Sequence, residues 1–146
     1  MGHHLKLEKK LYRVIDANAN RAREGLRVVE EISRLILDNS QLTSGWKKSR
    51  HGISVLLGKF PVNSNALIKE RESETDVGKD AYIEEEGKRG NYGEIAIINA
   101  RRAEEGIRVL EEFSKLIAPE VGRQFKKLRF KVYSLEKKTL AQLAKH

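Results

Sequence analysis

The sequence from Asn18 to Ser33 reads N-x-x-R-A-x-E-G-L-R-V-V-E-E-I-S, and it returns almost unchanged 81 positions later. The second copy, from Asn99 to Ser114, reads N-x-x-R-A-x-E-G-I-R-V-L-E-E-F-S. A repeat this dense indicates that one helical unit is present twice. We expect the two units to pack around a pseudo-two-fold axis.

The first copy lies within a long helical pattern. On a helical wheel that turns about 100° per residue, one continuous stripe of mainly apolar or small residues includes Gly25. The members of this stripe besides Gly25 are Leu11, Val14, Asn18, Ala22, Val29, Ile32 and Ile36. The pattern predicts a helix over residues 6–38.

Three further helices are predicted over residues 41–57, 91–117 and 119–144. The cluster Asp38-Asn39-Ser40 can end the first helix and start the second. Asn91 is a suitable N-cap residue, and Glu94 completes the spacing of a capping box. Pro119 suits the first turn of the last helix. The second helices of the two halves also match, because residues 46–50 align with residues 125–129.

The predicted fold class is therefore all-α, a single domain over residues 1–146. Two pseudo-symmetric helical hairpins, about residues 6–58 and 91–146, are expected to form a four-helix bundle. The connection over residues 59–90 shows neither helical nor strand periodicity. A loop of this length in a compact domain favours a functional role.

Composition narrows the classes of function. The chain lacks cysteine, which excludes disulfides and thiol chemistry, and its net charge is +8. That charge fits a phosphate-bearing small molecule, a nucleic acid or merely a solvated surface. Because only 6% of residues are aromatic and most fall at core positions, nucleic-acid binding is the weakest alternative. No apolar run is long enough to span a membrane and no signal peptide opens the chain, so we expect a cytoplasmic protein.

The repeated polar residues allow two interpretations. The pairs are Asn18 with Asn99, Arg21 with Arg102, Glu24 with Glu105 and Arg27 with Arg108. They form either a ladder of ion pairs on a helix surface or a polar pocket in which arginines bind phosphate. Gly25 and Gly106 lie inside the apolar stripe in both copies, which favours a close helix–helix approach over space for a ligand.

The two copies of the repeat, together with Arg50-His51 and Asp76-Val77-Gly78, resemble the helical N-terminal domain of cyanobacterial-type thiamine-phosphate synthases, which also occurs free-standing. The resemblance covers about residues 12–136. In those synthases a (β/α)8 barrel follows and performs the synthase step. Because this sequence ends at His146, we expect that barrel to be absent and do not transfer the synthase step.

The resemblance implies a phosphotransferase of thiamine biosynthesis that converts hydroxymethylpyrimidine phosphate to its diphosphate with ATP and Mg²⁺. The alternative is a non-catalytic module that binds a separate thiamine-phosphate synthase. A homodimer is also plausible. The residues expected to be catalytic are Arg21, Glu24, Arg102 and Glu105. Those expected to bind substrate are Asn18, Asn99, Arg27, Arg108, Arg50, His51, Arg71 and Arg129, with Asp76 as the metal ligand.

Overall fold

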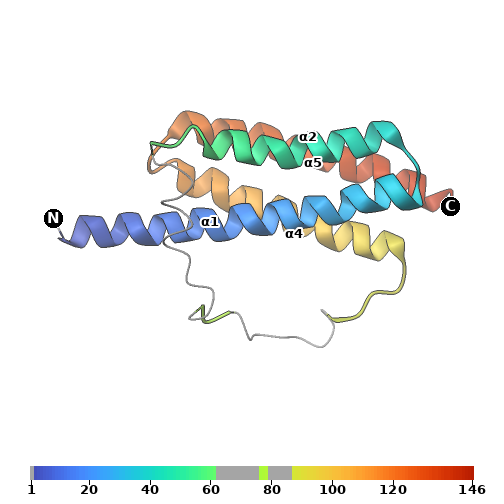
Figure 1. Cartoon of the computed structure of the whole chain (residues 1–146), viewed down its shortest axis with the longest axis horizontal. Coiled ribbons are helices and arrows are strands. Elements are labelled where there is room, and N and C mark those ends of the chain that lie inside the picture. Colours follow the sequence, from blue (N-terminus) through green and yellow to red (C-terminus); the bar gives the residue numbers. More distant parts are fainter. Residues whose placement is uncertain (1, 62–75, 79–86) are drawn as a thin grey trace.

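The computed structural model describes residues 2–61, 76–78 and 87–146, and this part of the chain is built from helices (Figure 1). The elements are α1 (Gly2–Glu31), the π-helical turn η1 (Ile32–Ile36), α2 (Ser40–Leu57), α4 (Tyr92–Ser114) and α5 (Pro119–Ala144). The predicted all-α class is confirmed. Among the described residues, no helix has both the length and the apolar character that a membrane span requires.

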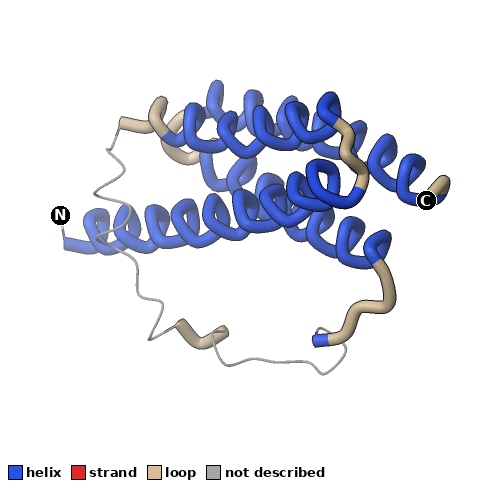
Figure 2. Tube along the Cα trace, turned by 45° about the vertical axis from the view of Figure 1, so that its right-hand side comes forward, coloured by secondary structure: helices blue, strands red, loops and turns tan. Residues whose placement is uncertain are grey.

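The four helices form an antiparallel bundle (Figures 1 and 2). Helix α1 continues through η1 and turns back into α2, and α4 turns back into α5, so each half is a helical hairpin. The hairpins meet mainly where α1 packs on α4, and α2 also contacts α5. The predicted arrangement of two hairpins is therefore present.

Most of the helix ends follow the capping signals in the sequence. The Asn39 side chain accepts a hydrogen bond from the Leu42 N–H at 2.9 Å, and the Asn91 side chain accepts one from the Glu94 N–H at 2.8 Å. Glu94 does not complete a standard capping box, because its carboxylate accepts from the Gly90 N–H instead. These bonds satisfy N–H groups that have no partner within the helix.

Three boundaries differ from the prediction by more than one residue. The first helix begins at Gly2 rather than at residue 6. The first helix is α-helical only to Glu31, and the segment up to Ile36 adopts the wider π-helical turn. The third helix ends at Ser114 rather than Ile117, and its last carbonyl accepts from the N–H groups of Ile117 and Ala118. Such turns use carbonyls that a continuing helix would have satisfied.

The core lies between the two layers of the bundle and includes both hairpins. Trp46 of α2 and Phe125 of α5 are fully buried, and they occupy equivalent positions in the two halves. The Trp46 indole N–H donates to the buried Thr139 hydroxyl of α5 at 3.0 Å. A buried indole N–H requires such a partner, so this bond fixes how α2 lies against α5.

The predicted loop over residues 59–90 lies largely outside the described residues, and Arg71 is among those that are not described. At its start Phe60 is buried, and its ring centroid lies 6.5 Å from that of Phe125. Asp76-Val77-Gly78 forms an exposed turn in which Asp76 Oδ1 accepts from the Gly78 N–H at 2.8 Å.

The two repeated glycines mark the place where α1 and α4 cross. A Cβ atom at Gly25 would lie 2.6 Å from the Asn99 carbonyl oxygen, and one at Gly106 would lie 3.0 Å from the Asn18 carbonyl oxygen. The helix backbones are thus too close to admit a side chain at Gly25 without a shift, and they leave room for only a tight contact at Gly106. The packing interpretation of these glycines is confirmed, and the contacts are reciprocal, as pseudo-two-fold symmetry requires.

Replacing Gly25 by alanine is expected to lower the free energy of unfolding by about 2 kcal/mol, because the methyl group would push apart two backbones. The intrinsic helix preference of alanine, worth about 1 kcal/mol, offsets only part of this cost. Gly52→Ala is the matched control, since a Cβ there would lie 3.6 Å from the nearest atom, in ordinary contact. Urea denaturation should rank Gly25→Ala below the wild type and Gly52→Ala at or above it. Equal stability of the two variants would contradict the close approach.

Candidate functional site

A buried carboxylate joins α1 to α2 in the first half. The Glu30 side chain is 5% exposed and lies 3.0 Å from Nε of Arg50 on α2. Arg27, one turn earlier on α1, lies 3.6 Å from the same carboxylate and 3.2 Å from Glu31. Arg34 completes the group at 3.7 Å from Glu31. The result is a cluster in which two acidic groups are shared by three guanidinium groups.

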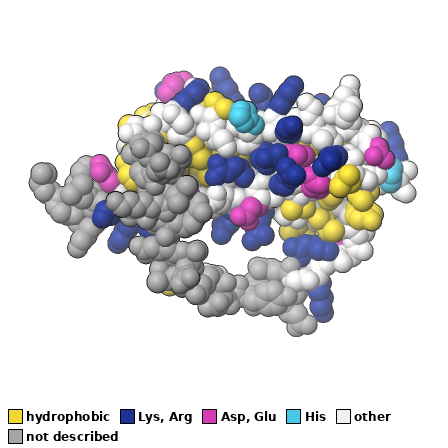
Figure 3. Space-filling model, viewed as in Figure 1, with side chains coloured by type: hydrophobic (Ala, Val, Ile, Leu, Met, Phe, Trp, Pro, Cys, Tyr) yellow, Lys and Arg dark blue, Asp and Glu magenta, His cyan; other side chains and the backbone are white. Residues whose placement is uncertain are grey.

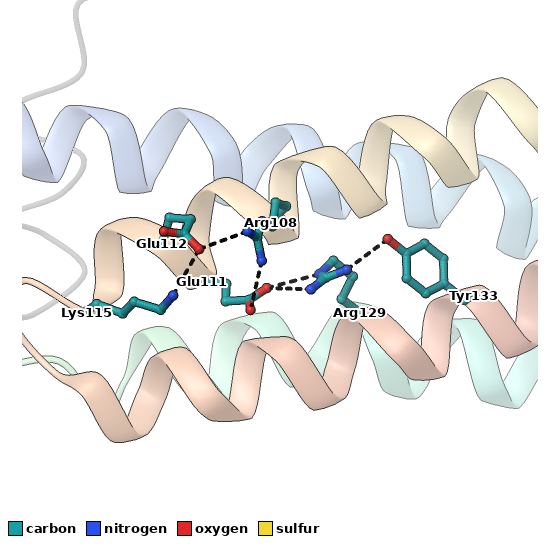
Figure 4. Close-up of polar contacts among 6 residues, drawn as sticks. All are labelled: Arg108, Glu111, Glu112, Lys115, Arg129 and Tyr133. Atoms are coloured by element: carbon teal, nitrogen blue, oxygen red, sulfur yellow. Dashed lines mark hydrogen bonds and ion pairs between the residues drawn. The ribbon is translucent and has the colours of Figure 1, made fainter.

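The second half repeats this cluster between α4 and α5 (Figure 4). The Glu111 side chain is 4% exposed and accepts hydrogen bonds from Arg129 at 3.0 Å and from Arg108 at 3.2 Å. Arg108 also lies 3.1 Å from Glu112, which accepts from Lys115 at 2.9 Å. The hydrogen bond from Lys115 lowers the pKa of Glu112.

The second cluster includes a tyrosine side chain that the first cluster lacks. Arg129 Nη1 donates to the Tyr133 hydroxyl at 2.9 Å, and the Arg129 guanidinium lies 5.6 Å from the centroid of the Tyr133 ring (Figure 4). The position equivalent to Tyr133 in α2 is Ser54. Arg129 therefore links the buried Glu111 to an aromatic side chain at the surface.

The two clusters are separate sites. Gly25 packs against Asn99 and Ala103, whereas Gly106 packs against Ala22, so α1 and α4 run antiparallel through this crossing. Glu30 and Glu111 then lie on opposite sides of it, on the order of 20 Å apart along the bundle at 1.5 Å per residue. The two clusters therefore do not combine into one polar pocket.

The structure gives the predicted residues different positions. Arg27, Arg50, Arg108 and Arg129 belong to the two clusters. Asn18 and Asn99 instead donate to carbonyls of their own helices, to Val14 and Ile95 respectively, both at 2.8 Å. The residues that are exposed and bond to no other described residue are Arg21, Glu24, Arg102, Glu105 and His51.

Charged side chains lie among apolar and uncharged ones on the face shown in Figure 3. Lys and Arg gather over the middle of this face with acidic side chains among them. The Arg27–Glu31 pair of the first cluster is partly exposed. Exposed pairs of this kind contribute little to stability.

A pocket of about 400 Å³ lies beside the second cluster, between α4 and α5. Its lining residues are Arg101, Glu104, Glu105, Arg108, Val109 and Tyr133. Its size suits a small single-ring ligand, and it combines two arginines, an aromatic side chain and carboxyl groups. Glu105 and Arg108 were expected from the repeat, whereas Glu104 and Tyr133 were not.

Glu104 has the most strongly altered acidity found in the described residues. Its side chain is buried, and burial raises the pKa of its carboxyl to about 8, assisted by a hydrogen bond to Glu136 and by repulsion from that group. The positive charge of nearby Arg101 lowers the pKa of Glu104 and so opposes these effects. At neutral pH Glu104 therefore retains its proton, and perturbed carboxyls of this kind gather at functional sites.

Sequence reasoning missed Glu30, Glu111, Glu104, Glu136 and Tyr133. The first two carried a usable signal, because both copies place a glutamate three residues after the repeated arginine. Glu104 and Glu136 carried none, since Arg23 and Leu57 occupy the equivalent positions in the first half. Only the packing of α4 against α5 brings the two carboxyls together.

Within the described ranges, no group of three or more His, Cys, Asp or Glu side chains could hold a metal ion. Asp76 is exposed, and one of its carboxylate oxygens already accepts from the Gly78 N–H. Magnesium bound with a nucleotide is held largely by phosphates and one or two carboxylates. The described carboxylates therefore fit a magnesium ion that arrives with its phosphate ligand better than one that the protein binds permanently.

Fold and site together define an all-α protein of two fused helical hairpins, with duplicated arginine–glutamate clusters and one adjoining pocket. A model of the ThiD2 family matches residues 13–138. The chain belongs to the ThiD2 family.

Similar proteins include the thiamine-phosphate synthase of Nostoc sp., which is 37% identical over 131 residues, 90% of this chain and 36% of that protein. The thiamine-phosphate synthase of Synechocystis sp. is 40% identical over 124 residues, covering 85% of this chain and 34% of that protein. The thiamine-phosphate synthase of Rhodopirellula baltica is 32% identical over 126 residues, covering 86% of this chain and 33% of that protein. The chain thus spans about a third of the length of these curated relatives. No solved structure matches it.

Proposed function

We propose that this protein acts in thiamine biosynthesis by phosphorylating hydroxymethylpyrimidine phosphate to the diphosphate, with ATP as donor. Its membership of the ThiD2 family and its similarity to thiamine-phosphate synthases support the pathway. The observation that supports phosphoryl transfer is the pocket beside Glu111, where Arg101 and Arg108 face a space that fits a single-ring phosphate.

The transfer places few demands on protein side chains. An oxygen of the substrate phosphate forms a bond to the γ-phosphorus of ATP, and the bond from that phosphorus to the β-bridging oxygen breaks to release ADP. The substrate phosphate is largely a dianion at neutral pH, because its second pKa is about 6, so no general base is required. Positioning and neutralisation of charge by arginines and Mg²⁺ then carry the catalysis.

Arg101 suits the binding of phosphate because it is exposed at the pocket and bonds to no other described residue. Replacing it by glutamine removes a charge-assisted hydrogen bond of roughly 1.5–3 kcal/mol, so kcat/KM should fall about 10- to 100-fold. Phosphorus NMR of the purified protein with hydroxymethylpyrimidine phosphate and ATP–Mg²⁺ measures both the diphosphate and ADP.

Arg123→Gln is the control, since it removes the same charge from an exposed arginine of α5 that pairs with Glu120. It should retain wild-type turnover. If the wild-type protein forms no diphosphate and shows no saturable binding of either substrate, the kinase proposal is wrong.

A second candidate is a non-catalytic module that binds a thiamine-phosphate synthase. The chain matches only a third of each such relative. Leu35 and Leu116, which occupy equivalent positions in the two copies, are 61% and 73% exposed. Sedimentation of this protein with a thiamine-phosphate synthase distinguishes the two candidates. A stable complex that Leu116→Glu disrupts, without any ATP consumption, favours the module.

A further inference from the structure

The pocket between α4 and α5 has an equivalent position in the first half, between α1 and α2, but its chemistry differs. The alignment of the halves pairs Glu24, Arg27 and Val28 with identical residue types at Glu105, Arg108 and Val109. The other three positions change, from Asn20, Arg23 and Ser54 to Arg101, Glu104 and Tyr133. The two halves are therefore symmetric in their clusters and asymmetric at this position.

In the first half the three changed residues bond to one another. Arg23 donates to the Asn20 side chain at 2.8 Å and to the Ser54 hydroxyl at 3.2 Å. The second of these bonds crosses from α1 to α2, at the position that is equivalent to the pocket of the second half. The first-half polar groups are thus satisfied internally, which leaves them little capacity for a ligand.

In the second half the equivalent residues do not bond to one another, because the Tyr133 hydroxyl accepts from Arg129 and Glu104 shares a hydrogen bond with Glu136. Glu104 is only 8% exposed and lines the pocket, and its Oε2 atom has no donor among the other described side chains. Oε1 of Glu136 on α5 is unsatisfied in the same way. A buried acceptor without a partner costs free energy, so a proton shared between the carboxyls, or a ligand, is required.

A carboxyl group that holds its proton presents one O–H donor beside one C=O acceptor. A ring with an amino group next to a ring nitrogen presents the complementary pair, an N–H donor beside a lone pair. Two parallel hydrogen bonds then form, with the carboxyl O–H donating to the ring nitrogen and the C=O accepting from the amino group. The raised pKa of Glu104 makes this protonated form the one present at neutral pH.

The remaining sides of the pocket suit the rest of such a ligand. Val109 and the Tyr133 ring provide an apolar surface for a flat heterocycle, and Arg129 holds Tyr133 in place through its hydroxyl. Arg101 and Arg108 lie on the same pocket and can bind a phosphate. Glu111 in turn fixes Arg108 and Arg129, so the buried cluster supports the pocket (Figure 4).

We propose that this single pocket, and not its first-half counterpart, binds the aminopyrimidine phosphate, with Glu104 pairing to the amino group and adjacent ring nitrogen and Arg101 and Arg108 binding the phosphate. The inference rests on the proposed function for the identity of the ring. It assigns one ligand site to a chain whose duplicated sequence suggests two.

Isothermal titration calorimetry without ATP tests this site, with hydroxymethylpyrimidine phosphate and its analogue lacking the amino group as probes. The wild-type protein should bind the amino compound about tenfold more tightly, with one site per chain, since the analogue leaves the carboxyl C=O without a donor. Glu104→Gln should retain this preference because an amide also offers one donor and one acceptor. Glu104→Leu should abolish it.

Glu120→Leu is the matched control, because it removes an exposed carboxylate of α5 that pairs with Arg123. It should bind both probes as the wild type does. Circular dichroism verifies that each variant is folded. Any one of three results would overturn the assignment. These are two sites per chain, equal affinity of the wild type for both probes, and an unchanged preference in a folded Glu104→Leu variant.

These outcomes separate the site from the kinase activity. If Glu104→Leu still forms diphosphate and binds the substrate with unchanged affinity, the kinase proposal stands and this pocket is not the site. If Glu104→Leu loses the binding preference but no variant shows turnover, the pocket assignment stands and the kinase proposal is wrong.

Discussion

Glu111→Gln is expected to lower the free energy of unfolding by about 3 kcal/mol and the melting temperature by about 10 °C. The carboxylate is buried and accepts from Arg129, whose side chain is only 11% exposed, and from Arg108. Glutamine keeps one acceptor oxygen but cannot neutralise the Arg129 guanidinium. An arginine left without its counter-charge in a buried position is among the costly consequences of a single substitution.

Glu112→Gln is the control for this prediction. Its carboxylate is 44% exposed and pairs with Lys115 and Arg108 at the surface, so its loss should change stability by less than about 1 kcal/mol. Glu30→Gln should fall between the two, because its partner Arg50 is 28% exposed. Urea denaturation at pH 7 measures all three variants. If Glu111→Gln and Glu112→Gln were equally stable, the buried cluster would have no special structural role.

Glu104→Gln is expected to remove a dependence of stability on pH that the wild type shows between about pH 4.5 and 8. The Glu104 carboxyl has an ordinary pKa of 4.5 when the chain is unfolded and a pKa of about 8 when it is folded. Between these values the folded protein binds the additional proton. The contribution of the protonated Glu104 carboxyl to the free energy of unfolding is therefore fully present below about pH 4.5 and is lost as the pH rises through 8.

The charged groups around Glu104 determine the size of this effect. Glu136 of α5 and Glu105 of α4 disfavour ionisation of Glu104, whereas Arg101 favours it. Since one pKa unit corresponds to about 1.4 kcal/mol, the wild type should lose a few kcal/mol relative to Glu104→Gln across this range. Above pH 8 the glutamine variant should be the more stable protein, because it has no buried carboxyl to ionise.

Thermal denaturation between pH 5 and 9 measures the difference between the two proteins. Glu120→Gln, which changes an exposed carboxylate of α5, should keep the slope of the wild type. Parallel pH profiles for the wild type and Glu104→Gln would show that Glu104 ionises as an ordinary surface carboxyl, and would remove one support of the proposed ligand site.

Much of the fold could be predicted because its causes are local. The stripe that contains Gly25 defines the buried side of α1, and Asn39, Asn91 and Pro119 mark where helices begin. The π-helical turn at Ile32–Ile36 could not be predicted, because it depends on how α1 meets α2 rather than on the residues themselves.

The candidate site was less predictable than the fold. The duplication drew attention to Arg21, Glu24 and their counterparts, all of which are exposed, and Glu105 among them lines the pocket. Arg50 and Arg129 occupy aligned positions in the second helices, and both lie against buried glutamates. Repetition in sequence reveals what the two halves share, whereas a ligand site can lie where they differ.

From its sequence alone, this chain is determined to be two copies of one helical hairpin, because apolar periodicity, capping residues and a dense repeat are all encoded locally. Only the tertiary structure decides that Glu104 meets Glu136, since the two residues come from different helices and have no counterpart in the first half. It also decides that Arg23 of α1 reaches Ser54 of α2. Side chains distant in sequence change their acidity and hydrogen bonding only when packing removes water from between them.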